Sequence, residues 1–593
     1  MTDHMNEARR THYCGTLTAA EIGQKVTVCG FTQKQRDLGN LVFIDLRDRT
    51  GIVQLAFGDK TDRAVFEKAG EVRSEFVLMA TGTVAKRESV NKDIPTGEVE
   101  ILVEDLKILG RAETPPFEIT EHSNVKEDLR LKYRYLDLRR PDLQQNIIMR
   151  HKIVKAARDF FDEQGFIEIE TPILIKSTPE GARDFLVPSR IHAGEFYALP
   201  QSPQIYKQLL MVSGFDRYVQ FARCFRDEDQ RADRQPEFTQ IDMEMSFVDA
   251  EDVMQMEERF VRTLFDKVLG VQIANPIPRL TYKDAMERYG SDKPDTRFGV
   301  EITDLTDLVK GCGFSVFASA CETGSVRAIC VPQGAAAYSR KELDKLTEFV
   351  RGIGAKGLAW AKVNPDGIQS SFSKFMAPEE LEAIAARAGA GEGDLLLIVA
   401  DAKNSVVLST LGALRGEVAK KMNLIPEGCY NFLWITEFPF FEWDEDLQTY
   451  VAMHHPFTSP MDEDIPLLDT DKGSVRAKAY DLVLNGFEMS SGSIRITDPV
   501  LQKKMFSALG LSDEEAQQKF GFLTDAFKYG APPHGGSGIG LDRLVMIMLG
   551  GSSIRDVVAF PKVQNMTELM TQCPSPVEVA QLDELHIALK TEE

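Results

Sequence analysis

The sequence predicts a multidomain α/β protein: a small β-barrel, then a larger domain of helices and long strands that is interrupted by an inserted α+β domain. The chain has 593 residues, which is enough for three to five domains at roughly 100–200 residues each. Its first 113 residues contain short strands separated by turn signals. From Pro141 a long amphipathic helix and longer strands follow, and these carry the densest polar motifs.

The changes of pattern set the expected domain boundaries. A pair of prolines, Pro115 and Pro116, marks a hinge after the barrel, and residues from about 295 hold little that is typical of catalysis. We expect a barrel at 1–113, a hinge at 114–140, a larger domain at 141–294 and 426–561, an insertion at 295–425, and a C-terminal extension at 562–593.

The composition is that of a globular protein, with 43% hydrophobic and 27% charged residues. No apolar run reaches the ~18 residues of a membrane span, and the polar start MTDHMNEARR is unlike a signal peptide. We therefore expect a cytoplasmic protein that does not associate with a membrane. The eight cysteines form no C-x-x-C pair, which favours reduced thiols and argues against a zinc site.

The charge balance gives an ambiguous indication of partners. A net charge of −22 argues against nucleic acid, because phosphate binding depends on Lys and Arg. Net charge is a sum, however, whereas a binding face is local. The run from Lys126 to Arg140 carries six cations. Such a run is more often a solvated face, so it indicates nucleic acid only where other features agree.

The first domain has the pattern of a base-binding barrel. Its expected strands are Val26–Phe31, Leu41–Arg47, Ile52–Phe57, Phe76–Lys86 and Glu98–Val103. Five short strands suit a Greek-key barrel of the OB type. Alternation along these strands places Phe43, Gln54 and Glu100 outward. An outward ring beside polar groups can stack on and read an unpaired base; the alternative is one stray surface Phe.

Two strands of the larger domain present polar groups to a common surface. Alternate residues of YVQFARCFRDE (218–228) and EFTQIDMEMSF (237–247) share one face each. Together these faces carry Arg226, Glu228, Phe238, Gln240, Asp242 and Glu244. Burying so many charges without partners is costly, so the pattern favours a binding site over a plain core. A later run, GGSGIGLDRLVMIMLG (535–550), permits close backbone approach to a ligand. It lacks the Walker A sequence and is weak evidence by itself.

Together these segments resemble the class II aminoacyl-tRNA synthetases. GFIEIETPIL (165–174) resembles motif 1 with Pro172 as its proline, CFRDED and RQPEFTQID resemble motif 2, and GSGIGLDR resembles motif 3. Asp542 stands where many members have Glu, a variation shared by the aspartyl branch. RDLGNLVFIDLRD, TPEGARDF, QSPQIYKQ, MHHPFTSP and GFEMSSGSIRI are also similar to that branch.

The resemblance covers essentially the whole chain and implies the rest of the architecture. The barrel would be an anticodon-binding OB-fold, and the larger domain an antiparallel sheet flanked by helices. The insertion is similar to the GAD-like domain of bacterial-type enzymes. Motif 1 implies a homodimer, since it forms the subunit interface in the family.

The resemblance implies that L-aspartate is activated with ATP and then transferred to tRNA-Asp, with Mg²⁺ assisting. Arg226 and Arg543 would be the catalytic residues, and Asp481 and Glu488 would hold the metal. Strand parity places these two carboxylates on opposite faces unless a bulge at Asn485-Gly486 realigns them. The implied ATP-binding residues are Arg226, Asp227, Glu228, Gln235, Phe238, Glu488, Gly540, Leu541, Asp542 and Arg543.

The amino acid would lie in a pocket whose cations, Arg495 and Lys207, pair with its side-chain carboxylate. Asp242 would orient them. The implied aspartate-binding residues are Glu180, Ser202, Gln204, Lys207, Arg226, Asp242, His454 and Arg495, with His455 as the alternative to His454. Asparagine would leave the two cations short of a counter-charge, at a cost of ~3–5 kcal/mol.

The residues that match the family's anticodon contacts are Arg36, Phe43, Gln54 and Glu100. Three alternatives remain open: asparaginyl-tRNA synthetase, a non-charging tRNA-binding relative, and an amide-forming ligase on the same catalytic fold. Lys207 with Arg495 argues against the first, the intact motifs against the second, and the barrel against the third. Charging of both tRNA-Asp and tRNA-Asn is also open, although Leu38 stands where some dual-specificity relatives carry His.

Overall fold

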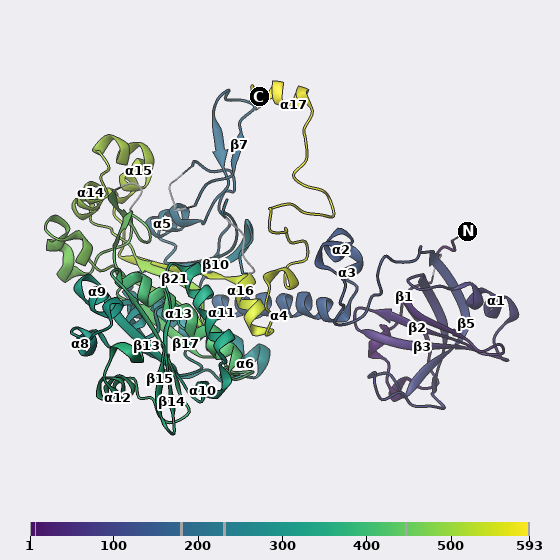
Figure 1. The fold of residues 1–593 in the computed structure, drawn as a ribbon. Coiled ribbons are helices and arrows are strands. Elements are labelled where there is room, and N and C mark those ends of the chain that lie inside the picture. Colours follow the sequence, from purple (N-terminus) through teal and green to yellow (C-terminus); the bar gives the residue numbers. More distant parts are fainter. Residues whose placement is uncertain (1, 6–7, 178–181, 229–232, 445–447, 591–593) are drawn as a thin grey trace. The chain divides into compact units, whose positions relative to one another are not determined.

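The computed structural model describes residues 2–5, 8–177, 182–228, 233–444 and 448–590. The chain divides into two compact units (Figure 1). The first comprises residues 1–151 and 555–576, and the second comprises residues 152–554 and 577–593.

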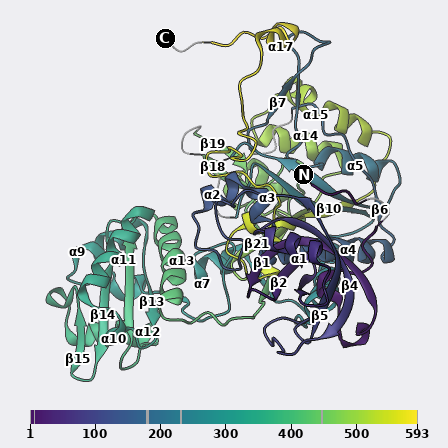
Figure 2. The same cartoon turned by 90° about the vertical axis from the view of Figure 1, so that its right-hand side faces the viewer.

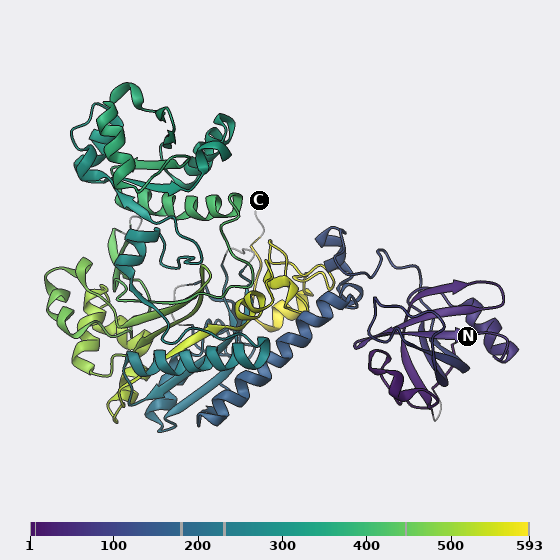
Figure 3. The same cartoon turned by 90° about the horizontal axis from the view of Figure 1, so that it is seen from below.

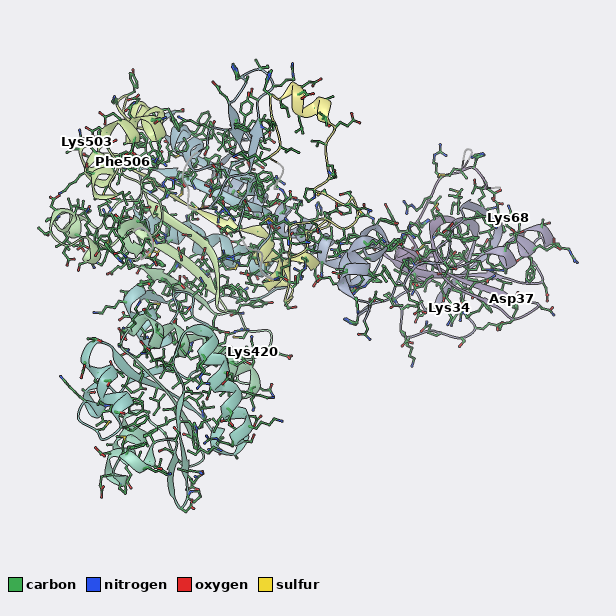
Figure 4. The ribbon with its side chains drawn as sticks, turned by 45° about the horizontal axis from the view of Figure 1, so that its top comes forward. Lys34, Asp37, Lys68, Lys420, Lys503 and Phe506 are labelled. Atoms are coloured by element: carbon green, nitrogen blue, oxygen red, sulfur yellow. The ribbon has the colours of Figure 1, made fainter. Side chains whose placement is uncertain are left out.

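The first unit contains the predicted five-stranded barrel, closed in the order β1-β2-β3-β5-β4. Its strands are β1 (Lys25–Asp37), β2 (Val42–Asp48), β3 (Gly51–Phe57), β4 (Val77–Lys86) and β5 (Val99–Gly110), with α1 (Arg63–Glu71) between β3 and β4. The predicted inward residues, among them Ile44, Leu55 and Ile101, form its core. Charged residues such as Lys34 and Asp37 lie on the outside of β1 (Figure 4).

The basic run after the barrel is largely structural. It forms α2 (Glu127–Lys132) and α3 (Arg134–Asp137), and α4 (Pro141–Glu163) follows. Buried Asp137 accepts hydrogen bonds from Arg130, Arg134 and Arg140 at 2.8–3.3 Å. Arg134 also donates to the carbonyls of residues 555, 558 and 559, at 2.8–2.9 Å. Half of the cations in this run therefore hold the hinge region together.

The second unit is built on an eight-stranded sheet, ordered β11-β17-β20-β21-β22-β10-β9-β6. Its strands are β6 (Ile167–Glu168), β9 (Arg217–Phe225), β10 (Glu237–Ser246), β11 (Arg279–Thr281), β17 (Phe432–Thr436), β20 (Ala479–Leu484), β21 (Phe487–Ile494) and β22 (His534–Gly540). Only the outer pairs β11–β17 and β6–β9 are parallel, which confirms the expected antiparallel sheet.

Helices and short hairpins surround this sheet. The end of α4 lies beside α6 (Ala250–Leu269) (Figure 3). The rings of Phe160 and Phe161 contact the ring of Phe260 there. The other elements are β7 (Leu186–Pro188), β8 (Phe196–Ala198), α5 (Gln204–Val212), α7 (Tyr282–Tyr289), β18 (Phe441–Asp444), β19 (Thr449–Ala452), α14 (Pro499–Ala508), α15 (Asp513–Phe527), α16 (Leu541–Met548) and α17 (Val579–Glu584).

The inserted segment forms a separate five-stranded sheet, ordered β12-β13-β16-β14-β15, with helices on both faces (Figure 2). Its strands are β12 (Ile302–Asp304), β13 (Ser325–Val331), β14 (Ala359–Asn364), β15 (Gly367–Ser370) and β16 (Leu395–Asp401). Its helices are α8 (Thr306–Val309), α9 (Ser315–Thr323), α10 (Gly334–Ala337), α11 (Arg340–Ile353), α12 (Pro378–Arg387) and α13 (Asn404–Lys421). The expected α+β insertion is therefore present. No helix in the described part of the chain combines the length and apolar character that a bilayer span requires.

Candidate active site

One face of the central sheet carries the predicted polar residues of β9 and β10. Across the β9–β10 ladder, Phe238 faces Cys224 and Asp242 faces Gln220. On the other side of β10, Asp242 faces Gly538 and Glu244 faces Gly536. Directly opposed residues of an antiparallel pair point to the same side. A side chain at Gly536 would collide with the Glu244 carboxylate, so the glycine leaves room for that charge.

A buried ion network lies at the centre of this face. Lys207 Nζ is 2.8 Å from Asp242 Oδ1 and 3.3 Å from Glu244 Oε2. Arg495 donates to both oxygens of the same Glu244, at 2.9 and 3.0 Å. Each of these four side chains is at most 5% exposed. The two predicted cations therefore meet on one carboxylate, Glu244, to which the sequence assigned no role.

The two carboxylates of the network titrate differently. Burial raises the pKa of Asp242 to about 6, because only Lys207 offsets the cost of its charge closely. Burial acts on Glu244 too, but the charges of Arg495 and Lys207 outweigh it and lower its pKa to about 2. With both carboxylates ionised, two negative charges balance two positive ones. The pocket is then neutral before any amino acid enters.

The other predicted amino-acid contacts differ in burial and in their partners. Gln204, the first residue of α5, is buried, and its Nε2 has no hydrogen-bond partner among the described residues. Ser202 lies just before it and is partly exposed. Glu180 lies outside the described residues. Burial, together with the charges of Arg495 and Lys207, lowers the pKa of His455 to about 3.

The adjacent histidine has different neighbours. Burial lowers the pKa of His454 to about 4, and Asp292 partly opposes this shift. The ring of His454 lies edge-on to Phe438, with centroids 4.9 Å apart. His455, the alternative, is therefore the histidine within electrostatic reach of the two cations.

A second set of residues, from motifs 2 and 3, is the predicted nucleotide side. The Arg226 guanidinium lies 5.1 Å from the centroid of the Phe238 ring. Arg543, from the first turn of α16, donates to the carbonyl oxygen of Glu488 and to Asp233 Oδ2. The Nε atoms of both arginines are buried, and the structure shows no partner for either in the described ranges.

The remaining predicted nucleotide residues belong to the same two motifs. The backbone N–H of Asp227 donates to the carbonyl of Arg183 at 3.1 Å, and Glu228 accepts from Arg234 at 3.1 Å. Gln235 is buried, and Asp542 accepts from the Thr239 N–H at 3.1 Å. Gly540 precedes α16 and Leu541 is its first residue.

The structure corrects the expected geometry of Asp481 and Glu488. Asn485 and Gly486 form no bulge; they are the two-residue turn between β20 and β21, with φ of 54° and 87°. The chain reverses there, and Glu488 faces Val483, which shares a face with Asp481. Strand parity does not carry across such a turn, so the two carboxylates lie on the same face.

These two carboxylates repel one another. Burial raises the pKa of Asp481 well above its usual range, and the nearby charge of Glu488 raises it further. Asp481 Oδ1 is buried and has no hydrogen-bond partner in the described part of the chain. Ser491 and the charge of Lys293 offset the shift only in part, so the pair is suited to a cation.

Sequence reasoning missed three contributors. Glu244 pairs with both Lys207 and Arg495. Ser493 Oγ accepts from Arg495 at 2.5 Å, and Asp233 accepts from Arg543 at 3.1 Å. Glu244 shares the strand face of Asp242, and that parity was the available signal. Ser493 lies two residues before Arg495, so alternation was a signal there too. The partner of Asp233 is Arg543, from a distant segment, so no local pattern indicates that contact.

The barrel carries a second predicted group of residues, which lines a cavity of about 970 Å³. Arg36 donates to the side-chain oxygen of Gln54 at 2.9 Å, and Arg87 donates to the same atom at 2.8 Å. The Gln54 amide donates to Glu100 at 2.6 Å. Phe43 lies 5.7 Å from the Arg36 guanidinium and is partly exposed. The four predicted residues are therefore brought together, with Arg87 as an unpredicted fifth.

Comparison with known proteins shows the family of this chain. Residues 126–564 match the family of tRNA synthetases class II (D, K and N), and residues 26–109 match the OB-fold nucleic acid binding domain. The chain belongs to the class II tRNA synthetases. The synthetase is thus an ATP-dependent ligase with an OB-fold domain, as the sequence predicted.

Individual relatives extend over the full length of the synthetase. An aspartate–tRNA ligase of Ruminiclostridium cellulolyticum is 58% identical, with 100% of both chains covered. An aspartate–tRNA(Asp/Asn) ligase of Caldanaerobacter subterraneus subsp. tengcongensis is also 58% identical, over 99% of this chain and 100% of the relative.

Solved structures share the fold. Asparaginyl-tRNA synthetase of Pyrococcus horikoshii, complexed with asparaginyl-adenylate, matches with a TM-score of 0.58 at 19% identity, covering 93% of this chain and 98% of the other. A putative aspartyl-tRNA synthetase of Leishmania major matches with a TM-score of 0.59 at 19% identity, covering 95% of each chain.

Proposed function

We propose that this synthetase is an aspartate–tRNA ligase, which converts L-aspartate and ATP to aspartyl-adenylate and transfers the aspartyl group to the 3′ end of tRNA-Asp. The observation that carries the proposal is the meeting of Lys207 and Arg495 on buried Glu244, at 3.3 and 3.0 Å from Oε2. An Arg fork and a Lys point charge suit a substrate carboxylate. The names of the relatives quoted above support the same substrate.

The buried network changes how we expect aspartate to be distinguished from asparagine. The sequence suggested two cations in need of a counter-charge, but Asp242 and Glu244 already supply two negative charges. A substrate carboxylate would bring a third, which favours protonation of Asp242, whose pKa is about 6. Asparagine would bring no charge and would place its amide donors against Lys207 and Arg495.

The first reaction requires positioning more than proton transfer. The α-carboxylate of aspartate, already ionised, attacks the α-phosphorus of ATP. A carboxyl oxygen–phosphorus bond forms, and the bond from that phosphorus to the pyrophosphate oxygen breaks. Arg226 would hold the α-phosphate and the attacking carboxylate, and Arg543 the γ-phosphate. Both guanidinium groups have a buried Nε without a partner among the described residues, so each retains a donor for a ligand.

We propose that Mg²⁺ binds at Asp481 and Glu488. Mg²⁺ is commonly held by one or two carboxylates together with substrate phosphates. The described residues contain no group of three or more His, Cys, Asp and Glu side chains suited to a metal. A pair of carboxylates that shares its cation with ATP fits that finding. When bound, the ion would offset the repulsion within the pair and the charge of the phosphates.

We propose that the barrel groove binds the anticodon. Stacking of a base on Phe43 would contribute ~1–3 kcal/mol. Gln54, whose amide is held between two arginines and Glu100, would position those charged groups against base edges.

We expect Phe43→Ala to weaken tRNA charging by roughly 5- to 150-fold. Aspartate-dependent pyrophosphate exchange should change little, and equal loss of both reactions would contradict this division of labour.

The proposed assembly is a homodimer through motif 1. The edge strand β6 has two residues, and the apolar side chains of Ile167, Ile173 and Leu174 are about half exposed. Exposed apolar groups at a sheet edge favour burial against a second copy.

We place the enzyme in the cytoplasm, where tRNA is charged.

Two measurements test the proposed function. Pyrophosphate exchange should depend on aspartate and not on asparagine; equal exchange with asparagine would overturn the substrate assignment. In charging assays with purified tRNA-Asp and tRNA-Asn, aspartate should then be transferred to tRNA-Asp alone. Charging of both would establish the dual-specificity alternative, which the name of the Caldanaerobacter relative favours. The absence of charging with either tRNA would identify a non-charging relative.

A further inference from the structure

A second concave site on the first unit has no part in the function proposed above. It is a cavity of about 320 Å³ lined by residues of the N-terminal segment, β1, β2 and the chain around α3. We call it the arginine pocket and define it by Arg10, Tyr13, Phe31, Arg47, Arg49 and Arg139.

Aromatic rings hold three of the four guanidinium groups in place. Arg10 lies 4.2 Å and Arg49 lies 5.0 Å from the centroid of the Tyr13 ring. Arg139 lies 4.0 Å from the centroid of Phe31. Cation–π contacts orient a guanidinium without neutralising its charge. These arginines therefore remain available to an anion.

The pocket has fewer carboxylates than cations. Glu75 accepts from Arg47 at 2.9 and 3.0 Å and from Arg139 at 2.8 Å. The other carboxylate, Asp48, accepts from backbone N–H groups and lies 3.9 Å from Arg10. Arg49 donates to the Tyr13 hydroxyl at 3.3 Å. Four arginines thus face two carboxylates, and the pocket carries an excess of positive charge.

One donor at this site lacks an acceptor. The Arg47 side chain is 4% exposed, and its Nη1 is buried with no hydrogen-bond partner in the described ranges. Buried polar groups in proteins nearly always have a partner, and each exception requires an explanation. Excess charge and an unused donor at one cavity indicate an anionic ligand.

The position of the pocket indicates which anion. Phe43, in the proposed anticodon groove, is the second residue of β2, and Arg49 directly follows the end of that strand, six residues later. At roughly 3.3 Å per residue this separation is about 20 Å. An RNA strand carries a phosphate at every nucleotide, so an RNA whose base stacks on Phe43 can place a phosphate several nucleotides away in the pocket.

We propose that the arginine pocket binds a backbone phosphate of tRNA, with Arg10 and Arg49 as the direct contacts. The inference depends on the proposed function, because it takes tRNA as the partner. Arg47 and Arg139, which donate hydrogen bonds to Glu75, line the pocket and contribute to its positive potential. Phosphate contacts of this kind position an RNA without reading its sequence.

The test is the salt dependence of tRNA binding, measured with purified tRNA-Asp between 50 and 300 mM KCl. The variant Arg10→Gln/Arg49→Gln should bind about tenfold more weakly at the lowest salt, from the loss of charge-assisted hydrogen bonds. The slope of log K against log salt should fall by about 0.7–0.9, the value for one phosphate. Arg49→Lys, which keeps the charge, should retain most of the slope.

Two controls separate this effect from general ones. Arg63, in an exposed pair with Glu67 on α1, allows the same change of charge in the same unit, and Arg63→Gln should leave the slope unaltered. Phe43→Ala should weaken binding without changing the slope, since stacking releases no counterion. Thermal midpoints of all variants should match the wild type, because both target side chains are at the surface.

The outcomes distinguish the pocket from the proposed function. If the wild type binds tRNA and the double variant keeps the full slope, the pocket proposal is overturned and the function stands. If inorganic phosphate stabilises the wild type but not the double variant, with the tRNA slope unchanged, the pocket takes a free anion and the proposal also fails. If the wild type itself does not bind tRNA, the proposed function has failed.

Discussion

The amino-acid pocket and the nucleotide side of the active site differ in how complete they are without ligands. In the pocket, Lys207 and Arg495 are paired with the buried carboxylates Asp242 and Glu244, and short contacts fix the positions of these cations. On the nucleotide side, two carboxylates repel one another and two arginines have unused donors among the described residues. We therefore expect the pocket to be preorganised for selectivity, whereas the charges of the ligands would complete the nucleotide side.

The largest expected effect comes from breaking the preorganised half. Arg495→Leu removes one cation and leaves Glu244 buried with Lys207 alone. Breaking a buried pair costs about 3–5 kcal/mol, or roughly two to four orders of magnitude. We expect aspartate-dependent pyrophosphate exchange to fall by that factor, while equilibrium dialysis still detects ATP binding.

An exposed arginine provides the control for this substitution. Arg387→Leu removes an arginine that pairs with Asp307 in the inserted domain and should leave exchange unchanged. Survival of exchange in Arg495→Leu would show that the pocket does not bind the substrate carboxylate.

The next largest effect is on pH dependence and tests whether the pocket is neutral. In the enzyme without aspartate, Asp242 is ionised above its pKa of about 6. A bound substrate carboxylate raises that pKa, so binding takes up a proton and weakens as pH rises. The KM for aspartate should therefore increase from pH 6 to 8, by up to about tenfold per unit. Asp242→Asn should remove this rise, and a KM that is flat in the wild type would refute the coupling.

The smallest expected effect concerns the incomplete half. A carboxyl whose pKa is raised on folding keeps a proton that the unfolded chain releases, so it lowers stability as pH rises above about 4. Asp481→Asn should therefore stabilise the protein at pH 8 by about 1 kcal/mol in urea unfolding. The same change should raise the Mg²⁺ concentration needed for half-maximal exchange.

Glu257→Gln is the matched comparison for that variant. Glu257 is also buried, and burial raises its pKa to about 7. It accepts from Ser537, on the opposite face of β22 from Gly536 and Gly538. We expect a similar gain of stability without a change in the Mg²⁺ requirement. If Asp481→Asn were stabilising and left that requirement unaltered, Asp481 would not be a metal ligand.

Local alternation predicted much of this molecule. The barrel strands, their inward residues and the polar faces of β9 and β10 all follow from a period of two, which a sequence displays directly. Lys207 and Arg495, 288 positions apart, needed the resemblance, because no local rule places them together. The place of Glu244 in the site could have been predicted from the sequence, since Glu244 shares the strand face of Asp242. Its role depends on which side chains arrive from α5 and from the end of β21, and that is a property of the folded sheet.

The carboxylate pair shows where a local rule fails. Parity is valid along one strand, and Asp481 and Glu488 lie on two strands joined by a turn. Once the turn at Asn485-Gly486 is known, the same rule gives the observed arrangement. The missing information was where the chain reverses, not how strands are built.

An irregularity in β21 connects the two halves of the site. Leu482 faces Ser490 while Val483 faces Glu488, so Met489 is an extra residue that has no counterpart on β20. Without it, Glu488 and Arg495, an odd number of positions apart, would project from opposite surfaces of the sheet. Deleting this single methionine would therefore separate the proposed metal ligand from the proposed substrate cation although both side chains remained in the chain. Spacing in this strand is thus as much a determinant of catalysis as the identity of its residues.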